Sequence, residues 1–199
     1  VGNTTSYRAE HLNDGTDYYF AVSAYDSSIP PNEGLLSPSA QATPSSTQYL
    51  SFGTGLNLFS LRVTLLPGSD TPEALFGSAD FTLYAWDAQS QRYRTYPAPS
   101  QDWLKPLQGY WVSLAQAATL PARGVSLDQT SPAGIELKAG WNLIGSPFAL
   151  TVPWDPQAIQ VQTTTIKTLA QAAHDGEVAD YAWTYLDGAY APVTDVPLP

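Results

Sequence analysis

The chain of 199 residues is long enough for one large or two small domains, and its hydrophobic content of 43% excludes a disordered chain. A net charge of −10, from 18 acidic and 8 basic residues, disfavours binding to nucleic acid or to anionic membranes. The absence of cysteine excludes disulfides, zinc–thiolate sites and thiol nucleophiles.

Residues 1–44 are predicted to form a first segment of three strands. The first strand covers residues 7–12 and ends at an Asn-Asp-Gly turn. The second covers residues 18–25, where successive side chains alternate between two faces. A turn-rich stretch with Pro-Pro-Asn, residues 26–34, separates it from a last strand at 36–43.

A spaced pattern runs through this segment: Leu12, Gly15, Thr16, Tyr18, Phe20, Val22, Ala24, Tyr25, Asp26 and residues 37–44. The pattern resembles the C-terminal half of a fibronectin type III domain. Leu12 and Tyr18 match the tyrosine corner of such sandwiches, in which the phenol bonds backward to the backbone. The resemblance implies a partial immunoglobulin-like sandwich with strands E, F and G only, whose strands A, B, C and C′ would precede Val1.

A first β-rich unit follows. A long apolar strand is expected over residues 55–66. Asp-Thr-Pro-Glu at 70–73 predicts a helix start, because it combines a capping residue, a proline in the first turn and an acid near the positive helix end. Strands at 81–86 and 92–96 are expected to pair as a hairpin, and a further strand is expected at 110–114.

The remaining residues predict a second unit of the same kind. A strand is expected at 141–146, stopped by proline. Apolar residues at helical spacing occupy 166–173, and strands at 181–185 and 190–193 are expected to form a hairpin. The sequence stops before a strand equivalent to 110–114 is reached.

The two units share one pattern. Gly-Leu-Asn-Leu at 55–58 is echoed by Gly-Trp-Asn-Leu at 140–143, and Tyr-Ala-Trp at 84–86 by the same triplet at 181–183. Such a repeat indicates a supersecondary unit used twice, and we expect the units to pack on each other because neither buries its apolar face alone. The predicted organisation is a partial fibronectin type III domain (1–44), a linker (45–52), β-repeat unit one (53–134) and a truncated β-repeat unit two (135–199).

Two motifs, Gly-Tyr-Trp-Val at 109–112 and Gly-Trp-Asn-Leu-Ile-Gly-Ser-Pro at 140–147, carry a second resemblance. They are similar to tandem modules found near the ends of large bacterial secreted and cell-surface proteins, often beside fibronectin type III domains. Unit one departs from the pattern at Leu56 and Phe59, where Trp and Ile would be typical. The resemblance implies a non-catalytic extracellular β-module.

No catalytic or metal site is predicted. Neither His11 nor His174 lies near a serine in a nucleophile-elbow context, and His174 ends an expected helix, where its charge suits the negative helix end. Paired carboxylates could hydrolyse glycosides, but each candidate lies at a turn signal: Asp87, Asp155, Asp180 and Asp187. No sequence motif places a calcium ion.

Carbohydrate binding is the main functional rival, because Tyr181, Trp183 and Tyr185 would share one strand face, as would Tyr84 and Trp86. Aromatic residues at a period of two also fill small β cores. The scaffold hypothesis predicts buried rings at 181–185 and no pocket there. The carbohydrate hypothesis predicts at least two exposed, coplanar rings. We interpret the glycines at 109, 140 and 145 as turn or bulge positions, since no phosphate-loop context accompanies them.

The sequence thus predicts a mainly β protein that is not an enzyme, has no cofactor, and acts as a structural or adhesive module at the bacterial surface or outside the cell. Its expected partners are other domains of the same polypeptide or neighbouring assembly subunits, with a glycan as the alternative; no nucleic acid and no transmembrane segment are expected. Without methionine, position 1 is not an initiator. The missing strands are expected elsewhere in the same polypeptide, with donation by a neighbouring subunit as the alternative.

Overall fold

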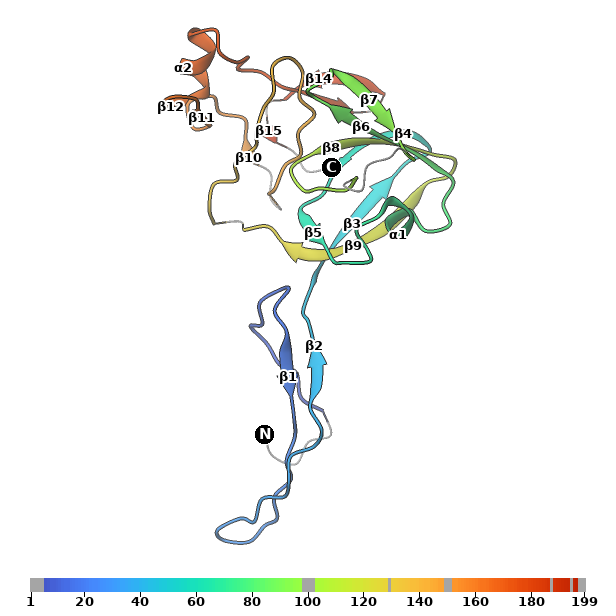
Figure 1. The fold of residues 1–199 in the computed structure, drawn as a ribbon, viewed down its shortest axis with the longest axis vertical. Coiled ribbons are helices and arrows are strands. Elements are labelled where there is room, and N and C mark those ends of the chain that lie inside the picture. Colours follow the sequence, from blue (N-terminus) through green and yellow to red (C-terminus); the bar gives the residue numbers. More distant parts are fainter. Residues whose placement is uncertain are drawn as a thin grey trace.

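A computed structural model describes residues 6–97, 103–128, 130–148, 152–186, 188–193 and 195–196. The protein is mainly β, as predicted, and its sheets are antiparallel. Figure 1 shows a long arm that carries the first two strands and projects from a body that contains all other elements.

The arm is a two-stranded ribbon in which β1 (Tyr18–Phe20) pairs with β2 (Ala40–Ala42). The bond predicted for a tyrosine corner is present, because the Asn13 backbone N–H donates to Tyr18 Oη at 3.0 Å. The strand predicted over residues 7–12 is absent, since no described strand lies beside it to complete a ladder.

No second layer covers the arm among the residues that the structure describes. Val22 is 71% exposed and Leu36 68%, although both belong to the predicted strands. The observed arm is therefore one layer with an uncovered apolar face, where the sequence predicted three strands of a sandwich.

The body contains two sheets that face each other. The first has the order β3-β9-β5 and the second β4-β8-β6-β7. Their strands are β3 (Ser46–Phe52), β4 (Gly55–Ser60), β5 (Val63–Leu65), β6 (Phe81–Asp87), β7 (Arg92–Thr95), β8 (Gly109–Leu114) and β9 (Ala118–Ser126). The predicted hairpin at 81–96 and the predicted strand at 110–114 are both confirmed.

The core lies between these two sheets. Leu83, Tyr110 and Val112 point inward from neighbouring strands and are fully buried. Phe59 meets the Tyr110 ring at 5.4 Å and the Phe76 ring edge-on at 6.0 Å. Full burial of such side chains contributes roughly 1.5–3 kcal/mol each, so this cluster is the main source of the body's stability.

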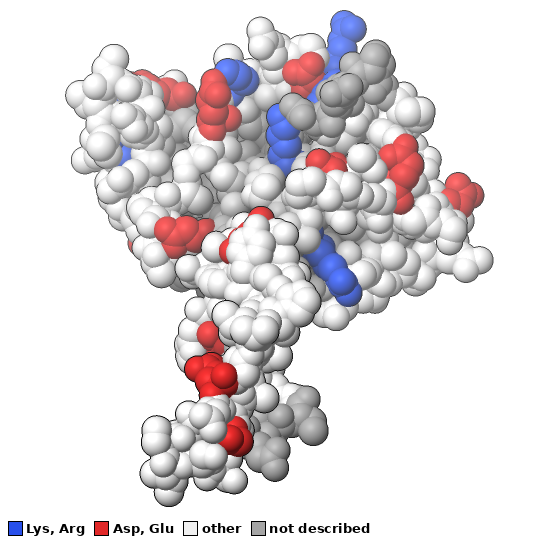
Figure 2. Space-filling model, turned by 60° about the horizontal axis from the view of Figure 1, so that its bottom comes forward, with Lys and Arg blue, Asp and Glu red and all other residues white. Residues whose placement is uncertain are grey.

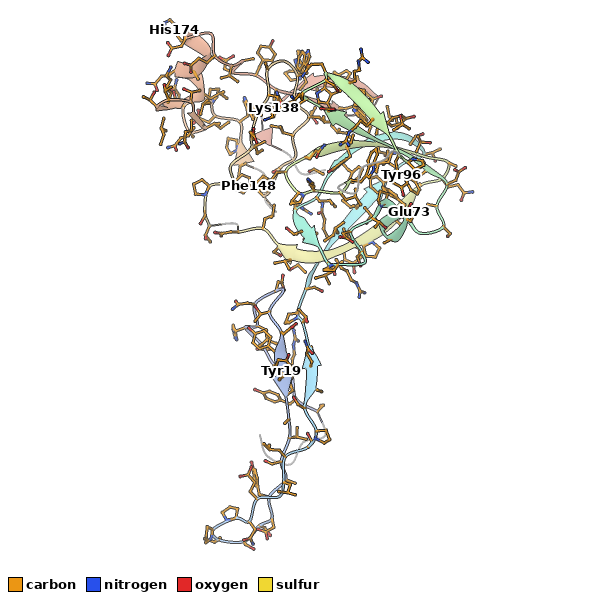
Figure 3. All side chains as sticks on the ribbon, viewed as in Figure 1. Tyr19, Glu73, Tyr96, Lys138, Phe148 and His174 are labelled. Carbon is orange, nitrogen blue, oxygen red and sulfur yellow. The ribbon has the colours of Figure 1, made fainter. Side chains whose placement is uncertain are left out.

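The helix predicted from Asp-Thr-Pro-Glu is confirmed as α1 (Pro72–Phe76). Thr71 caps it by accepting a hydrogen bond from the Ala74 N–H at 3.2 Å, and Glu73 lies in the first turn. Glu73 and Tyr96, labelled in Figure 3, lie on the side of the body where α1 covers the core. The short helix therefore closes the core at this edge.

The linker predicted at 45–52 is wrong, because nearly all of it forms β3 and pairs along its length with β9. Leu50 and Phe52 are buried on its inner face. Gln48 is buried beside them, and its amide donates to the Ser60 carbonyl at 3.1 Å. Because Gln48 is polar but occupies an inward position, the alternation of apolar residues in β3 could not be recognised in the sequence.

The strand predicted at 55–66 is divided into β4 and β5, which belong to different sheets. β4 ladders with β8, whereas β5 ladders with β9. Leu61, between them, is fully buried and bridges to Pro106. The chain therefore crosses from one sheet to the other at Leu61.

The second unit forms only two-stranded sheets among its described residues. They pair β10 (Val152–Pro153) with β15 (Asp195–Val196), β11 (Gln160–Gln162) with β12 (Ile166–Thr168), and β13 (Trp183–Leu186) with β14 (Ala189–Pro192). The last pair is the predicted hairpin.

Two predictions for this unit differ from the structure. The helical spacing at 166–173 covers a strand, β12, followed by helix α2 (Leu169–His174), because Thr168 forms a capping box with Gln171 and starts the helix there. The strand predicted at 141–146 is reduced to one bridge, between Ile144 and Gln108. No described neighbouring strand pairs with the rest of that segment.

Candidate functional site

Trp111 is the centre of an aromatic interface between the two units. Its neighbours in β8, Tyr110 and Val112, face the core, so Trp111 faces outward; yet it is only 5% exposed. The rings of Tyr185 and Tyr190, from the β13–β14 hairpin, meet it edge-on at 4.8 Å and 6.4 Å. The hairpin therefore covers the outer face of the sheet and buries Trp111.

The aromatic interface continues along β7. Trp111 Nε1 donates to Tyr93 Oη at 3.1 Å, and the Tyr93 ring lies edge-on to Trp86, its cross-strand partner, at 4.8 Å. Tyr185 and Tyr190 form the same kind of cross-strand pair at 5.4 Å. Such contacts each add about 0.5–1.5 kcal/mol beyond burial of area.

This pairing corrects one detail of the sequence comparison. The shared Tyr-Ala-Trp triplet aligned Trp86 with Trp183, but Trp183 lies opposite Pro192, whereas Trp86 lies opposite Tyr93. The turns cause the shift, because residues 88–91 separate the first pair of strands and residues 187–188 the second. The structural counterpart of Trp86 is therefore Tyr185.

Gln91 binds the segment that enters the second unit. Its Oε1 accepts the Trp141 N–H at 2.8 Å, and its Nε2 donates to the carbonyls of Trp141 and Ala139 at 3.0 Å and 3.2 Å. Trp86 Nε1 donates to the same Trp141 carbonyl at 2.7 Å. Side chains of the first unit thus satisfy backbone groups that a neighbouring strand would otherwise bind.

The three glycines singled out in the sequence allow this close approach. A Cβ at Gly140 would lie 2.6 Å from Gln91 Oε1, one at Gly145 would lie 2.5 Å from Ser60 Cβ, and one at Gly109 would lie 2.8 Å from Leu143 Cγ. Only Gly140 of the three has a positive φ, +89°, as its predicted turn role requires. The other two are contact positions.

Asn57 and Asn142 make matching hydrogen bonds in the two units. Asn57 Oδ1 accepts the Gly53 N–H, and its Nδ2 donates to the carbonyls of Gly53 and Gly55. Asn142 Oδ1 accepts the Lys138 N–H, and its Nδ2 donates to the carbonyls of Lys138 and Gly140. This side chain therefore fixes the same glycine turn at both positions.

The carboxylates considered for glycoside hydrolysis are dispersed in turns. Asp87 accepts the backbone N–H groups of Gln89 and Ser90, and hydrogen bonding from Ser90 lowers the pKa of this carboxyl. Asp155 accepts the Gln157 N–H at 2.9 Å, and the Asp180 carbonyl accepts Trp154 Nε1. Asp187 lies outside the described residues.

Both histidines are exposed, His11 in the arm and His174 at the end of α2. A shallow hollow of about 500 Å³ lies beside α2, lined by Gln157, Lys167, Ala170, Gln171, His174 and Asp175. No cluster of three or more metal-ligating His, Asp or Glu side chains occurs in the part of the chain that the structure describes.

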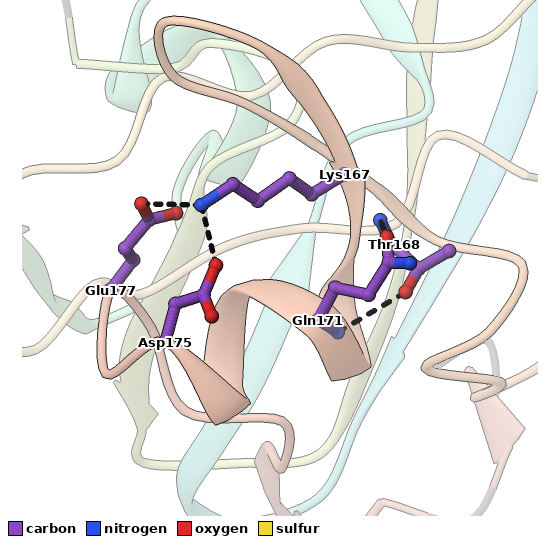
Figure 4. Close-up of polar contacts among 5 residues, drawn as sticks. All are labelled: Lys167, Thr168, Gln171, Asp175 and Glu177. Carbon is purple, nitrogen blue, oxygen red and sulfur yellow. Dashed lines mark hydrogen bonds and ion pairs between the residues drawn. The ribbon is translucent and has the colours of Figure 1, made fainter.

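Two residues that line the hollow, Lys167 and Asp175, belong to an ion-pair cluster (Figure 4). Lys167 Nζ lies 2.6 Å from an Asp175 oxygen and 2.7 Å from a Glu177 oxygen. The Asp175 contact raises the pKa of Lys167, and the Lys167 hydrogen bond lowers the pKa of Asp175. Both groups are thereby held in their charged forms, which suits a structural tie rather than proton transfer.

The rings proposed for carbohydrate stacking are exposed but not coplanar. Tyr181 is 57% exposed and Trp183 49%, and their ring planes meet at 80°. The scaffold hypothesis predicted buried rings, so the exposure of these two rings contradicts it. The carbohydrate hypothesis predicted coplanar rings, so the angle between the planes contradicts it. Of the three rings at 181–185, Tyr185 contacts Trp111 and lies in the aromatic interface.

Comparison with family models, curated proteins and solved structures found no match for this chain. None of its described helices is both long and apolar enough to cross a bilayer. Figure 2 shows acidic side chains along the arm as well as on the body, in line with the net charge of −10.

Sequence reasoning missed Gln91 and the central position of Trp111. Gln91 lies in a polar turn with no motif, so no local signal marks it. Trp111 was part of a recognised motif, but its outward direction follows only from the inward direction of Tyr110 and Val112.

Proposed function

We propose that this chain is a non-catalytic structural or adhesive module of a larger secreted or cell-surface protein, located outside the bacterial cell. The burial of Trp111 between the two units carries this proposal. An aromatic contact reinforced by Gln91 resists bending between the units, which is what a rigid spacer needs.

The matching bonds of Asn57 and Asn142 support the view that one unit is used twice. Repeated β-units stack on neighbours and gain stability from the contact. The acidic surface keeps such a spacer soluble and discourages adsorption to anionic polymers. The resemblance to tandem surface modules points the same way.

We further propose that the arm belongs to a fibronectin-type sandwich completed by other strands of the larger polypeptide. Val22 and Leu36 lie on the uncovered face, and an isolated two-stranded hairpin is marginally stable in water. Other domains of the same polypeptide, or neighbouring assembly subunits, are therefore the expected partners of this arm.

Small-angle X-ray scattering of the chain and of a Gln91→Ala, Trp111→Ala double variant tests the spacer function. The unaltered chain should scatter as one compact body with a projecting arm. The variant should show a larger radius of gyration and a flexible profile. A flexible profile for the unaltered chain would refute a rigid spacer.

Carbohydrate binding by an accessory region of a secreted hydrolase is the second candidate. The half-exposed rings of Tyr181 and Trp183 favour it, because aromatic surfaces bind the apolar faces of sugars. Affinity electrophoresis in gels that contain cell-wall or plant polysaccharides would test it. Retardation that is lost in Trp183→Ala, but kept in Tyr49→Ala, would favour this candidate over the spacer.

A further inference from the structure

Two apolar positions that are buried in the first unit are uncovered in the second. With Asn57 aligned on Asn142, Phe52 corresponds to Leu137 and Phe59 to Ile144. Phe52 and Phe59 are 5% and 2% exposed, whereas Leu137 and Ile144 are 47% and 40% exposed. The sequence keeps apolar residues at both positions, but only the first unit covers them.

The cover in the first unit consists of two consecutive strands, β8 and β9, which belong to different sheets. β8 lies between β4 and β6 and pairs with both, and its Tyr110 ring meets Phe59. β9 pairs with β3, where Ala118 lies opposite Phe52. Removal of these two strands would expose both phenylalanines and one edge of β6.

The second unit has the flanking elements but no counterpart of β8 or β9 among its described residues. β13 corresponds to β6 and pairs with β14, and no described strand pairs with its other edge. Segment 140–145 corresponds to β4 and has a single bridge, between Ile144 and Gln108. The unpaired edge of β13 and the exposed apolar side chains of Leu137 and Ile144 are therefore found in the same unit.

We propose that this open face of the second unit binds two consecutive strands of the β8–β9 kind from a partner polypeptide. The inserted strand would alternate large apolar residues, as Gly-Tyr-Trp-Val-Ser-Leu does at 109–114. Charge supports the same occupant, because residues 103–126 contain Lys105 and Arg123 and no acid, whereas residues 135–199 contain seven acids and two lysines. This proposal deepens the proposed function by giving the module a partner.

The test uses the whole chain and a synthetic peptide that copies residues 103–126. The peptide should raise the melting temperature in a concentration-dependent way and protect the β13 amides from hydrogen exchange. A peptide with Tyr110→Asp and Val112→Asp should do neither. A fusion that carries the same copy after Pro199 on a flexible linker repeats the test if the free peptide aggregates.

Variants of the acceptor locate the site. Leu137→Asn and Ile144→Asn replace side chains that are nearly half exposed, so the free chain should keep its stability while its affinity for the peptide falls about tenfold or more. Leu35→Asn, in the arm and 98% exposed, is the matched control and should bind as the unaltered chain does.

Three results would overturn the proposal: no stabilisation by either peptide or fusion, equal binding by the Leu137→Asn and Ile144→Asn variants, or a dimer of the unaltered chain in which two copies exchange β8–β9. The scattering experiment depends on Trp111 and Gln91 and not on this face. If the chain scatters as a rigid body but does not bind the peptide, the proposed partner is refuted and the spacer function is retained.

Discussion

The indole of Trp111 and the phenol ring of Tyr185 meet edge-on, with centroids 4.8 Å apart and planes at 79°. The first belongs to the sheet of one unit and the second to the hairpin of the next. Because Trp111 is 5% exposed, this contact excludes water from the junction. The mechanical connection between the units is therefore a packed aromatic contact and not a tether.

Trp111→Ala should destabilise the chain by about 3–5 kcal/mol, as expected for removal of a large buried aromatic side chain. Urea unfolding measures the loss. A double-mutant cycle with Tyr185→Ala should give a coupling of about 0.5–1.5 kcal/mol. Tyr49→Ala, at a ring that is 69% exposed, should stay within about 0.5 kcal/mol of the unaltered chain. Additive effects of the two interface changes would contradict the contact.

Asn57→Ala and Asn142→Ala should both destabilise the chain, each by about 1–2 kcal/mol, because three backbone groups lose their partner in either variant. Asn57→Ala should lose more stability than Asn142→Ala, since the Asn57 bond to the Gly55 carbonyl is partly buried, whereas all three bonds of Asn142 are exposed. Substitution by Asp keeps the acceptor and removes both donated bonds. If Asp rescued either turn fully, the donated bonds would not matter.

Gly145→Ala should cost about 1–3 kcal/mol, because the new Cβ would lie 2.5 Å from Ser60 Cβ and 3.0 Å from the Gln108 carbonyl. Gly134→Ala is the matched control, since a Cβ there meets nothing within 4 Å. Chemical denaturation of both variants measures the difference. Equal stabilities would mean that the segment does not lie against the first unit as described.

The Lys167 ion pairs should make the stability of the second unit depend on pH. The lowered pKa of Asp175 means that its contribution is present above its ordinary pKa of 3.8 and is lost as pH falls through the lower folded value. The raised pKa of Lys167 means a contribution that is complete below 10.5 and is lost at higher pH.

The difference in unfolding free energy between the chain and Lys167→Met should therefore shrink at both ends of the pH range. Lys138→Met, which removes only the local pair with Glu136, serves as control. A difference that stays constant from neutral to strongly acidic pH would contradict the ion-pair account.

Tyr110 should titrate late, because burial raises the pKa of its phenol to about 12. Below the ordinary value of 10 its contribution to stability is complete, and it is lost as pH rises toward 12, since only the unfolded chain ionises in that interval. Ultraviolet difference spectra against Tyr110→Phe isolate this group. Ionisation near its ordinary value would mean that the core is open to water.

The elements that local patterns define were predictable. Thr71 and Pro72 determine where α1 begins, and the alternation of Leu83 and Ala85 with Tyr84 and Trp86 determines a strand covered on both faces. The hydrogen bond that Tyr18 accepts from the Asn13 N–H was implied by the resemblance of Leu12 and Tyr18 to a tyrosine corner. In each case the determining residues lie within a few positions of one another.

What the sequence hid depends on distant partners. β9 lies between β3 and β5, and its Pro121 argues against such an inner position. Pro121 itself pairs only with Tyr49 of β3, because the ladder with β5 starts at Gly124. β3 was not predicted because Gln48 is polar at an inward position. Its amide can be buried there since it donates to the Ser60 carbonyl of β4, in the other sheet. The aromatic interface could not be predicted, because Trp111 and Tyr185 are distant in the sequence and no local pattern indicates their contact.

Differential scanning calorimetry of the whole chain tests the central claim most directly, which is that the two units form one body joined through Trp111. A single transition for residues 46–196, with calorimetric and van't Hoff enthalpies that agree, is the predicted result, and Trp111→Ala should split it into two. Two separate transitions in the unaltered chain would show that the units unfold independently, and would contradict the rigid module.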